Sequence, residues 1–224
     1  MFNNELKLSK FDLGDKNMLS SLIECYKDAF AYKPWQEWKI CNNCKKKFSK
    51  EDKNKFVLNF KCPNCSQELS DFWTYKQVEK DIKHELNHQL SSCYILTENN
   101  ISVVGFCWGY VLDSMELEKH INLPNISKNL QKNFPNLKQF AYQDEIGMIK
   151  KYQGKKLAKL LFQARLNDFI KWGVNIGVVR TKTLPPTVTY LWYLRLGYKV
   201  IQEYNDEDGR VIMAINFNKL KFSN

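Results

Sequence analysis

The sequence predicts an α+β fold, an α/β/α sandwich in which helices flank a mixed, mainly antiparallel central sheet. Three observations predict it: strand and helix periodicities alternate along the chain, a turn containing glycine joins an apolar strand to a long helix, and two CxxC pairs mark a small insertion. The 224 residues, 44% of them hydrophobic, can fill one core but would be crowded as two full-size domains. We therefore expect one domain over residues 1–224, with residues 39–72 inserted into it.

Apolar residues at strand and helix spacing predict the elements outside the insertion. The first half is expected to form a strand, two helices and an antiparallel strand pair, at residues 6–11, 15–30, 74–89, 93–97 and 102–112. The second half is expected to continue strand, helix, strand, helix, strand, strand, at residues 140–149, 155–172, 178–182, 187–196, 198–204 and 211–217. Residues 114–137 are polar, contain two prolines and lack a sustained period, which predicts a long loop with one helical turn.

The helix expected over residues 74–89 carries the motif HExxH at His84-Glu85-Leu86-Asn87-His88. On a helix this motif can place two imidazoles on a metal and a carboxylate beside them. The apolar stripe of Val78, Ile82, Leu86 and Leu90 instead directs His84 and His88 toward solvent. The position of the usual third ligand is Tyr94, and Glu116 is only a distant substitute. We therefore favour a chance match on a surface helix over a metalloprotease.

Two CxxC pairs, Cys41 with Cys44 and Cys62 with Cys65, predict a zinc ribbon within the insertion. Four thiolates leave Zn²⁺ no open coordination position, so the metal is expected to stabilise the ribbon and not to catalyse. A redox dithiol would require a thioredoxin-like context, and a disulfide would require an oxidising compartment. The odd count of seven cysteines, with neither a signal sequence nor a membrane span, predicts a cytoplasmic protein without membrane association.

The formal net charge of +10 predicts attraction for anions. Nucleic acid is one candidate partner, and the lysine-rich ribbon would be its binding surface. A polyphosphate cofactor is another, and an ordinary soluble surface rich in lysine explains the charge equally well. Composition alone therefore leaves these three alternatives open.

The segment Gln153-Gly154-Lys155-Lys156-Leu157-Ala158 joins the strand at residues 140–149 to a long helix. Unpaired backbone N–H groups and the positive end of a helix dipole meet at such a junction, and together they bind phosphate. With the preceding residues 146–152, this segment resembles the acetyl-CoA loop of the GNAT N-acetyltransferase superfamily, whose signature is Gln or Arg, two residues, Gly, one residue, then Gly or Ala. Gln153 and Ala158 match the first and last positions, whereas Lys156 replaces the middle glycine.

Other segments resemble the same superfamily. Tyr193-Leu194-Arg195-Leu196-Gly197-Tyr198 is similar to the Tyr, three residues, Gly, aromatic pattern of its last helix, although the asparagine often found seven residues earlier is Pro186. Residues 105–110 and 34–37 look like one GNAT subgroup. The resemblance covers nearly everything outside residues 39–72.

The resemblance implies transfer of the acetyl group of acetyl-CoA to a primary amine of a small molecule or protein, by direct attack in a ternary complex. Backbone amides near Met148 and Ile149 would hold the acetyl carbonyl and the pantetheine arm, and Tyr193 would protonate the leaving thiolate. The pyrophosphate would lie on Gln153, Gly154, Lys155, Lys156, Leu157 and Ala158. The favoured general base is Glu145, with Asp144 second, because the resemblance implies a carboxylate or a water chain on this strand beside the acceptor cleft. Only one of two successive strand residues can face the cleft, and the sequence does not say which.

The acceptor amine is expected near Trp35, Glu37, Trp38 and Trp108. A rival interpretation is a catalytically weak GNAT-like binding module, in which Lys156 weakens the cofactor loop and the basic ribbon binds nucleic acid or protein. The sequence fits a monomer or a homodimer.

Overall fold

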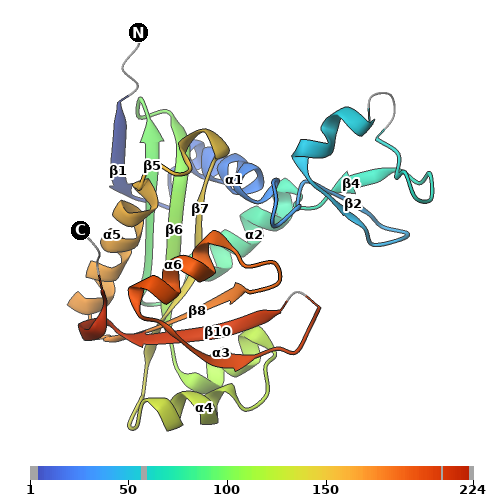
Figure 1. The fold of residues 1–224 in the computed structure, drawn as a ribbon. Coiled ribbons are helices and arrows are strands. Elements are labelled where there is room, and N and C mark those ends of the chain that lie inside the picture. The colour runs from blue at the N-terminus through green and yellow to red at the C-terminus, as the bar shows by residue number, and fades with distance from the viewer. Residues whose placement is uncertain (1–4, 57–59, 208, 222–224) are drawn as a thin grey trace. The chain divides into compact units, whose positions relative to one another are not determined.

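The computed structural model describes residues 5–56, 60–207 and 209–221. Its main sheet has seven strands in the order β1-β5-β6-β7-β8-β10-β9, and the insertion adds a small sheet with the order β3-β2-β4 (Figure 1). Strands β1–β5, β8–β10 and β9–β10 pair antiparallel, whereas β7–β8 is parallel. The predicted fold class, a mixed and mainly antiparallel sheet flanked by helices, is therefore confirmed.

The structure gives each element its bounds. The strands are β1 (Leu6–Lys10), β2 (Lys39–Cys41), β3 (Lys47–Phe48), β4 (Leu69–Asp71), β5 (Ser91–Glu98), β6 (Ser102–Leu112), β7 (Phe140–Met148), β8 (Ile176–Lys182), β9 (Lys199–Glu203) and β10 (Arg210–Asn216). The α-helices are α1 (Lys16–Phe30), α2 (Tyr75–Leu86), α3 (Ser114–Ile121), α4 (Ile126–Asn133), α5 (Leu157–Lys171) and α6 (Val188–Leu196). Short 3₁₀ helices are η1 (Lys50–Phe56), η2 (Lys150–Tyr152) and η3 (Phe217–Lys219). None of the helices in these described parts is both long and apolar enough to span a bilayer.

The chain forms two compact units. The first, called unit 1 below, comprises Met1–Leu86, Cys93–Cys107 and Ile146–Phe162. The second, called unit 2, comprises Asn87–Ser92, Trp108–Glu145 and Gln163–Asn224.

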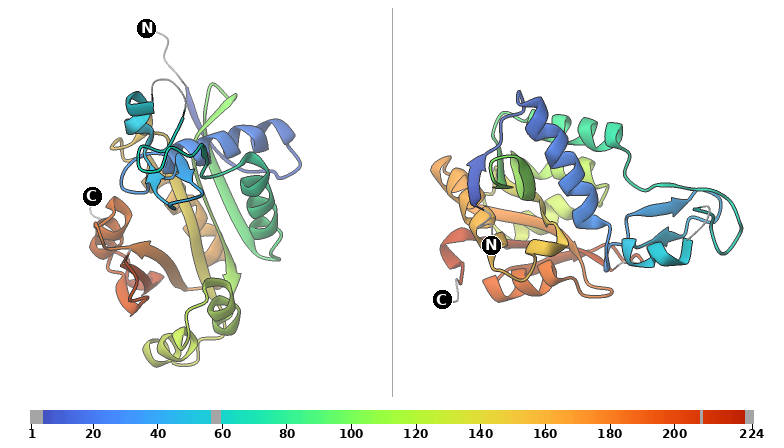
Figure 2. Two further views of the ribbon diagram at one scale, coloured as in Figure 1. Left: turned by 90° about the vertical axis from the view of Figure 1, so that its right-hand side faces the viewer. Right: turned by 90° about the horizontal axis from the view of Figure 1, so that it is seen from above.

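In unit 1, helices cover both faces of the strands. Asp15 caps α1 by accepting the N–H groups of residues 17 and 18, and α1 packs against α2 (Figure 2). On one face, the ring of Phe106 in β6 stacks on Tyr26 of α1, with centroids 5.7 Å apart. On the other face, the thiol of Cys107 donates to the carbonyl of Leu161 in α5. Because successive strand residues point to opposite faces, this alternation produces the predicted sandwich.

The insertion has its own small core, formed by Cys41, Phe48, Cys62 and Leu69. Its first and last strands pair with each other, with Lys39 opposite Asp71. Residues 57–59 of the predicted insertion lie outside the described residues. The ends of the insertion thus adjoin.

In unit 2, the prediction of a long loop over residues 114–137 is wrong, because the structure has α3 and α4 there. Asp113 and Glu116 form a capping box that starts α3. Both helices bury an apolar stripe against one face of the sheet; the stripe comprises Leu117, Ile121, Ile126 and Leu130. The polar residues that concealed this period lie on the opposite side of each short helix.

Candidate functional site

Four cysteines of unit 1 form the only group among the described residues that could hold a metal ion. The sulfurs of Cys41, Cys44, Cys62 and Cys65 all lie within 4.8 Å of one another. Cys41 and Cys65 are 3.4 Å apart, and Cys44 and Cys62 are 3.5 Å apart. Four thiolates about 2.3 Å from one zinc ion would be about 3.8 Å apart, so the observed spacing fits Zn²⁺.

The ribbon is tied to the start of the predicted cofactor loop. The carboxylate of Glu51 in η1 forms an ion pair with the ammonium of Lys150 in η2, with Oε1 and Nζ 2.7 Å apart. The ring of Tyr32 contacts two ammonium groups, with Nζ of Lys150 4.5 Å and Nζ of Lys50 5.7 Å from its centroid. Lys150 stands three residues before Gln153, so ribbon and loop share a set of electrostatic contacts.

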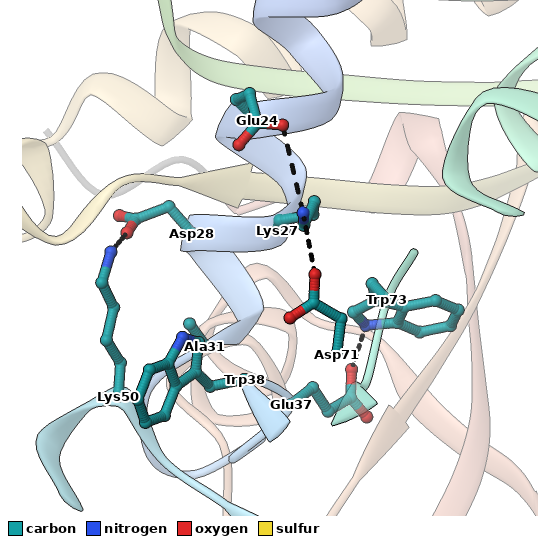
Figure 3. A pocket seen from close by; sticks show the side chains of 9 residues that line it. All are labelled: Glu24, Lys27, Asp28, Ala31, Glu37, Trp38, Lys50, Asp71 and Trp73. Atoms are coloured by element: carbon teal, nitrogen blue, oxygen red, sulfur yellow. Dashed lines mark hydrogen bonds and ion pairs between the residues drawn. The ribbon is translucent and has the colours of Figure 1, made fainter. Parts of the chain in front are cut away.

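A cavity of about 370 Å³ lies beside the ribbon in unit 1 (Figure 3). Two residues predicted to contact the acceptor, Glu37 and Trp38, line it. The other lining residues were not predicted: Glu24, Lys27, Asp28, Ala31, Lys50, Asp71 and Trp73. Its carboxylates are engaged, since Asp28 pairs with Lys50 and Asp71 pairs with Lys27 and Lys39, while Glu37 accepts from Lys47 and Trp73. The cavity therefore presents indole faces and charges of both signs.

The other two tryptophans of that prediction lie elsewhere. The indole of Trp35 is half-buried and packs edge-on against Phe30. Trp108 is only 1% exposed, and its carbonyl accepts a hydrogen bond from buried Arg165. We therefore leave Trp108 out of the site that we propose.

The predicted cofactor loop is exposed from Gln153 to Lys156. Gly154 has a φ of +74°, and a Cβ built on it would meet nothing within 4 Å. Lys156 has a φ of +61°, so it keeps the left-handed conformation that a glycine would adopt at that signature position. The replacement alters the charge of the loop and leaves its backbone path intact. The side-chain amide of Gln153 donates a hydrogen bond through Nε2 to the backbone carbonyl of Met148, which fixes the loop to the end of β7.

Two backbone amides were expected to hold the acetyl group and the pantetheine arm. The N–H of Ile149 donates to the carbonyl of Val104 in β6, so it is already used within the sheet. Successive N–H groups of a strand point to opposite sides, which directs the amide of Met148 away from β6. Met148 is therefore the better candidate of the two.

In unit 2, Tyr193 lies on α6, which Thr187 caps at its N-terminus and Gly197 at its C-terminus. The phenol is 3% exposed, and its ring contacts Trp192 and Tyr198 at 5.6 and 4.9 Å between centroids. Tyr198 accepts a hydrogen bond from Gln143, and burial raises its pKa.

The two candidate bases point to opposite faces of β7. The hydroxyl of Tyr110 donates to Oδ2 of Asp144 at 2.9 Å, and Nε2 of His120 lies 3.1 Å from the same hydroxyl. Tyr142 belongs to this cluster: it is fully buried, and its ring contacts those of Tyr110 and His120. Its hydroxyl has no hydrogen-bond partner among the described residues. Burial is also the main cause of the raised pKa of Tyr142. Asp144 thus lies in a polar network that residue types alone did not reveal.

The HExxH match does not form a helical metal site. Helix α2 ends at Leu86, so His88 lies beyond it. The prediction that both imidazoles face solvent holds for His84 and is wrong for His88, which is half-buried. The ring of His88 stacks on Tyr110 with centroids 4.2 Å apart and planes 7° apart. Sheet pairing, which a helical wheel ignores, brings these rings together.

No protein-family model and no curated protein matches the chain. Solved structures do. The PaiA N-acetyltransferase from Thermoplasma acidophilum, in complex with coenzyme A, is 13% identical over 95% of this chain and 99% of its own, with a TM-score of 0.54. The ribosomal-protein-S18-alanine N-acetyltransferase from Escherichia coli is 13% identical over 95% of this chain and 94% of its own, with a TM-score of 0.53. A structure from Desulfovibrio desulfuricans assigned to the GNAT family is 11% identical over 95% of this chain and 99% of its own, with a TM-score of 0.52. At these identities the likeness shows the fold alone.

Proposed function

We propose that this chain, which has the GNAT acetyltransferase fold, transfers the acetyl group of acetyl-CoA to a primary amine. The observation that carries the proposal is the exposed turn from Gln153 to Lys156, which links the end of β7 to the first turn of α5. Its left-handed residues bend the backbone, and the unpaired N–H groups of the helix start are suited to a diphosphate. The bound coenzyme A of the Thermoplasma structure supports the same ligand.

Acetyl-CoA would supply an activated acyl group as a thioester. Gln153, Gly154, Lys155, Lys156, Leu157 and Ala158 would hold its diphosphate, and the amide of Met148 would lie along its pantetheine arm. Lysines at positions 155 and 156 would add charge attraction to the backbone contacts. Tyr193 would give its proton to the departing thiolate, which a neutral buried phenol can do.

For the general base we favour Asp144 over Glu145. Asp144 accepts a hydrogen bond from Tyr110 and neighbours the unpartnered hydroxyl of Tyr142, so it lies among polar groups suited to an ammonium. An acceptor amine is protonated at neutral pH, and it must lose that proton before nitrogen attacks carbon. Asp144 would accept the proton. The acceptor would be a small molecule or a protein amine, with Glu37 and Trp38 beside the ribbon contributing to its selection.

Thiol release from acetyl-CoA in the presence of a panel of primary amines tests the function. We expect turnover with at least one amine, and binding of acetyl-CoA measured by calorimetry. Tyr193→Phe should lower kcat by about 10- to 100-fold with little change in cofactor affinity. Tyr190→Phe on the same helix is the matched control and should remain active. Absence of cofactor binding by the wild type would refute the proposal.

The zinc ribbon is proposed to be structural. Its basic charge is partly neutralised, because Lys39, Lys47 and Lys50 all form ion pairs with carboxylates. This observation weakens the rival binding-module interpretation, since paired lysines have less attraction left for phosphate.

A further inference from the structure

A continuous chain of polar groups leads from the half-buried carboxylate of Asp144 to solvent. The hydroxyl of Tyr110 contacts Oδ2 of Asp144 at 2.9 Å and Nε2 of His120 at 3.1 Å, so one oxygen joins both groups. Tyr110 is 0% exposed, whereas His120 on α3 is exposed. A proton at Asp144 can therefore reach bulk water through two hydrogen bonds.

We propose that Tyr110 and His120 form a proton relay that carries the proton of the acceptor ammonium from Asp144 to solvent. The inference rests on the proposed acetyl transfer and adds to it residues that the cofactor loop and Tyr193 do not involve. It also assigns a role to α3, because this helix places His120 next to Tyr110 of β6.

The protons balance along this path. In the resting state Tyr110 donates to the carboxylate of Asp144 and accepts from Nε2–H of His120. When the N–H bond of the ammonium breaks, an O–H bond forms on Asp144. Exchange with water first moves the imidazole proton from Nε2 to Nδ1, which leaves a lone pair on Nε2. The carboxylic acid of Asp144 then donates its proton to the oxygen of Tyr110 while the Tyr110 proton passes to Nε2 of His120. The imidazolium formed releases its Nδ1 proton to water, which restores the starting tautomer. Each step breaks and forms one bond to hydrogen, so the path needs no oxidant, metal or other reactant.

The surroundings hold the relay in place. His88 stacks on one face of the Tyr110 ring, and the rings of His120 and Tyr142 meet it edge-on, with centroids 6.0 and 5.7 Å away. Three neighbouring rings leave Tyr110 little freedom to rotate, so its hydroxyl stays aligned between its two partners. Fixed donors and acceptors of this kind lower the cost of reorganisation during proton transfer.

The test uses His120→Ala, which removes an exposed side chain and should leave the fold intact. With the amine that the wild type acetylates fastest, kcat should fall about 10-fold, with KM for acetyl-CoA unchanged. Added imidazole should restore most of the lost rate, because it can reach the exposed position and accept the proton from Tyr110. His84→Ala, also an exposed histidine, is the matched control and should neither lose activity nor respond to imidazole. Tyr110→Phe should lose at least as much activity as His120→Ala and should not be rescued.

Each outcome decides a separate point. A fully active His120→Ala would overturn the relay while acetyl transfer stands. So would a slow variant that imidazole leaves slow, since that result indicates a structural role for the side chain. A wild type that binds acetyl-CoA but acetylates no amine would refute the proposed function, and the relay with it.

Discussion

The buried hydroxyl of Tyr142 leads to a prediction about stability. The side chain is 0% exposed, and its oxygen has no hydrogen-bond partner in the part of the chain that the structure describes. A buried polar group without a partner costs about 1 to 3 kcal/mol of folding free energy, because it gives up its hydrogen bonds to water. Tyr142→Phe removes this oxygen and keeps the ring packing, so we expect the variant to be more stable by about 1 kcal/mol.

Tyr110→Phe is the matched control. Its ring is equally buried, but its hydroxyl has partners in Asp144 and His120. Without that hydroxyl, Asp144 and His120 must form their hydrogen bonds with water instead. Because both reach the surface, we expect a loss near the lower limit, about 1 kcal/mol. The two Tyr→Phe changes should therefore shift the free energy of unfolding in opposite directions, so that the two variants differ by about 2 kcal/mol although each loses the same hydroxyl group.

Urea unfolding of the metal-loaded protein measures both values, and thermal melting gives a second reading. For a chain of 224 residues, 1 kcal/mol corresponds to about 2 to 4 °C in Tm. If Tyr142→Phe lowers the stability as much as Tyr110→Phe does, then the Tyr142 hydroxyl makes a favourable interaction in solution. Such a result would refute the reasoning from burial.

Three further predictions concern the ribbon, the loop and alkaline pH. Cys44→Ser should release zinc and destabilise the ribbon, whereas Cys93→Ser, a buried cysteine outside it, should retain the metal; elemental analysis that finds equal zinc in both would contradict the four-cysteine site. Lys156→Gly should raise stability by about 0.5 to 1 kcal/mol, because it relieves a left-handed conformation that disfavours side chains, while Lys155→Gly, without that conformation, should lower it; equal effects in urea unfolding would count against the backbone argument. Burial raises the pKa of Tyr198 above its unfolded value of 10.0, so the stability that it contributes is complete below pH 10 and is lost as the pH rises further. Between pH 9 and pH 11, Tyr198→Phe should lose about 1.4 kcal/mol less unfolding free energy than the wild type, and an identical loss would show that Tyr198 ionises normally in the folded state.

The main sheet and its principal helices could be predicted because each has a clear local signal. Thr74 caps α2, with its hydroxyl accepting the N–H of Gln77. The helices α3 and α4 were missed because each has only eight residues, too few for a convincing period in a polar context. The capping box of Asp113 and Glu116 was the available signal.

The polar cluster of unit 2 could not be predicted from residue types. Its members come from three separate segments, around Tyr110, His120 and Asp144, and only sheet register and the position of α3 bring them together. The choice between Asp144 and Glu145 depends on which of the two shares a face with Tyr110, and alternation alone does not say which face that is. Local sequence carries no information about such contacts.

The pairing of β2 with β4 bears on how the ribbon can be manipulated. Lys39 and Asp71 face each other in the ladder and also form a 2.6 Å ion pair, so the chain leaves the host fold and returns to it at one place. Adjoining ends need only a tight turn to reconnect them, and a short closure costs little chain entropy. A variant in which a few glycines and serines replace the ribbon would therefore keep the path from α1 to α2. It would show whether the metal-bearing module governs which amines are accepted or only how long the protein survives.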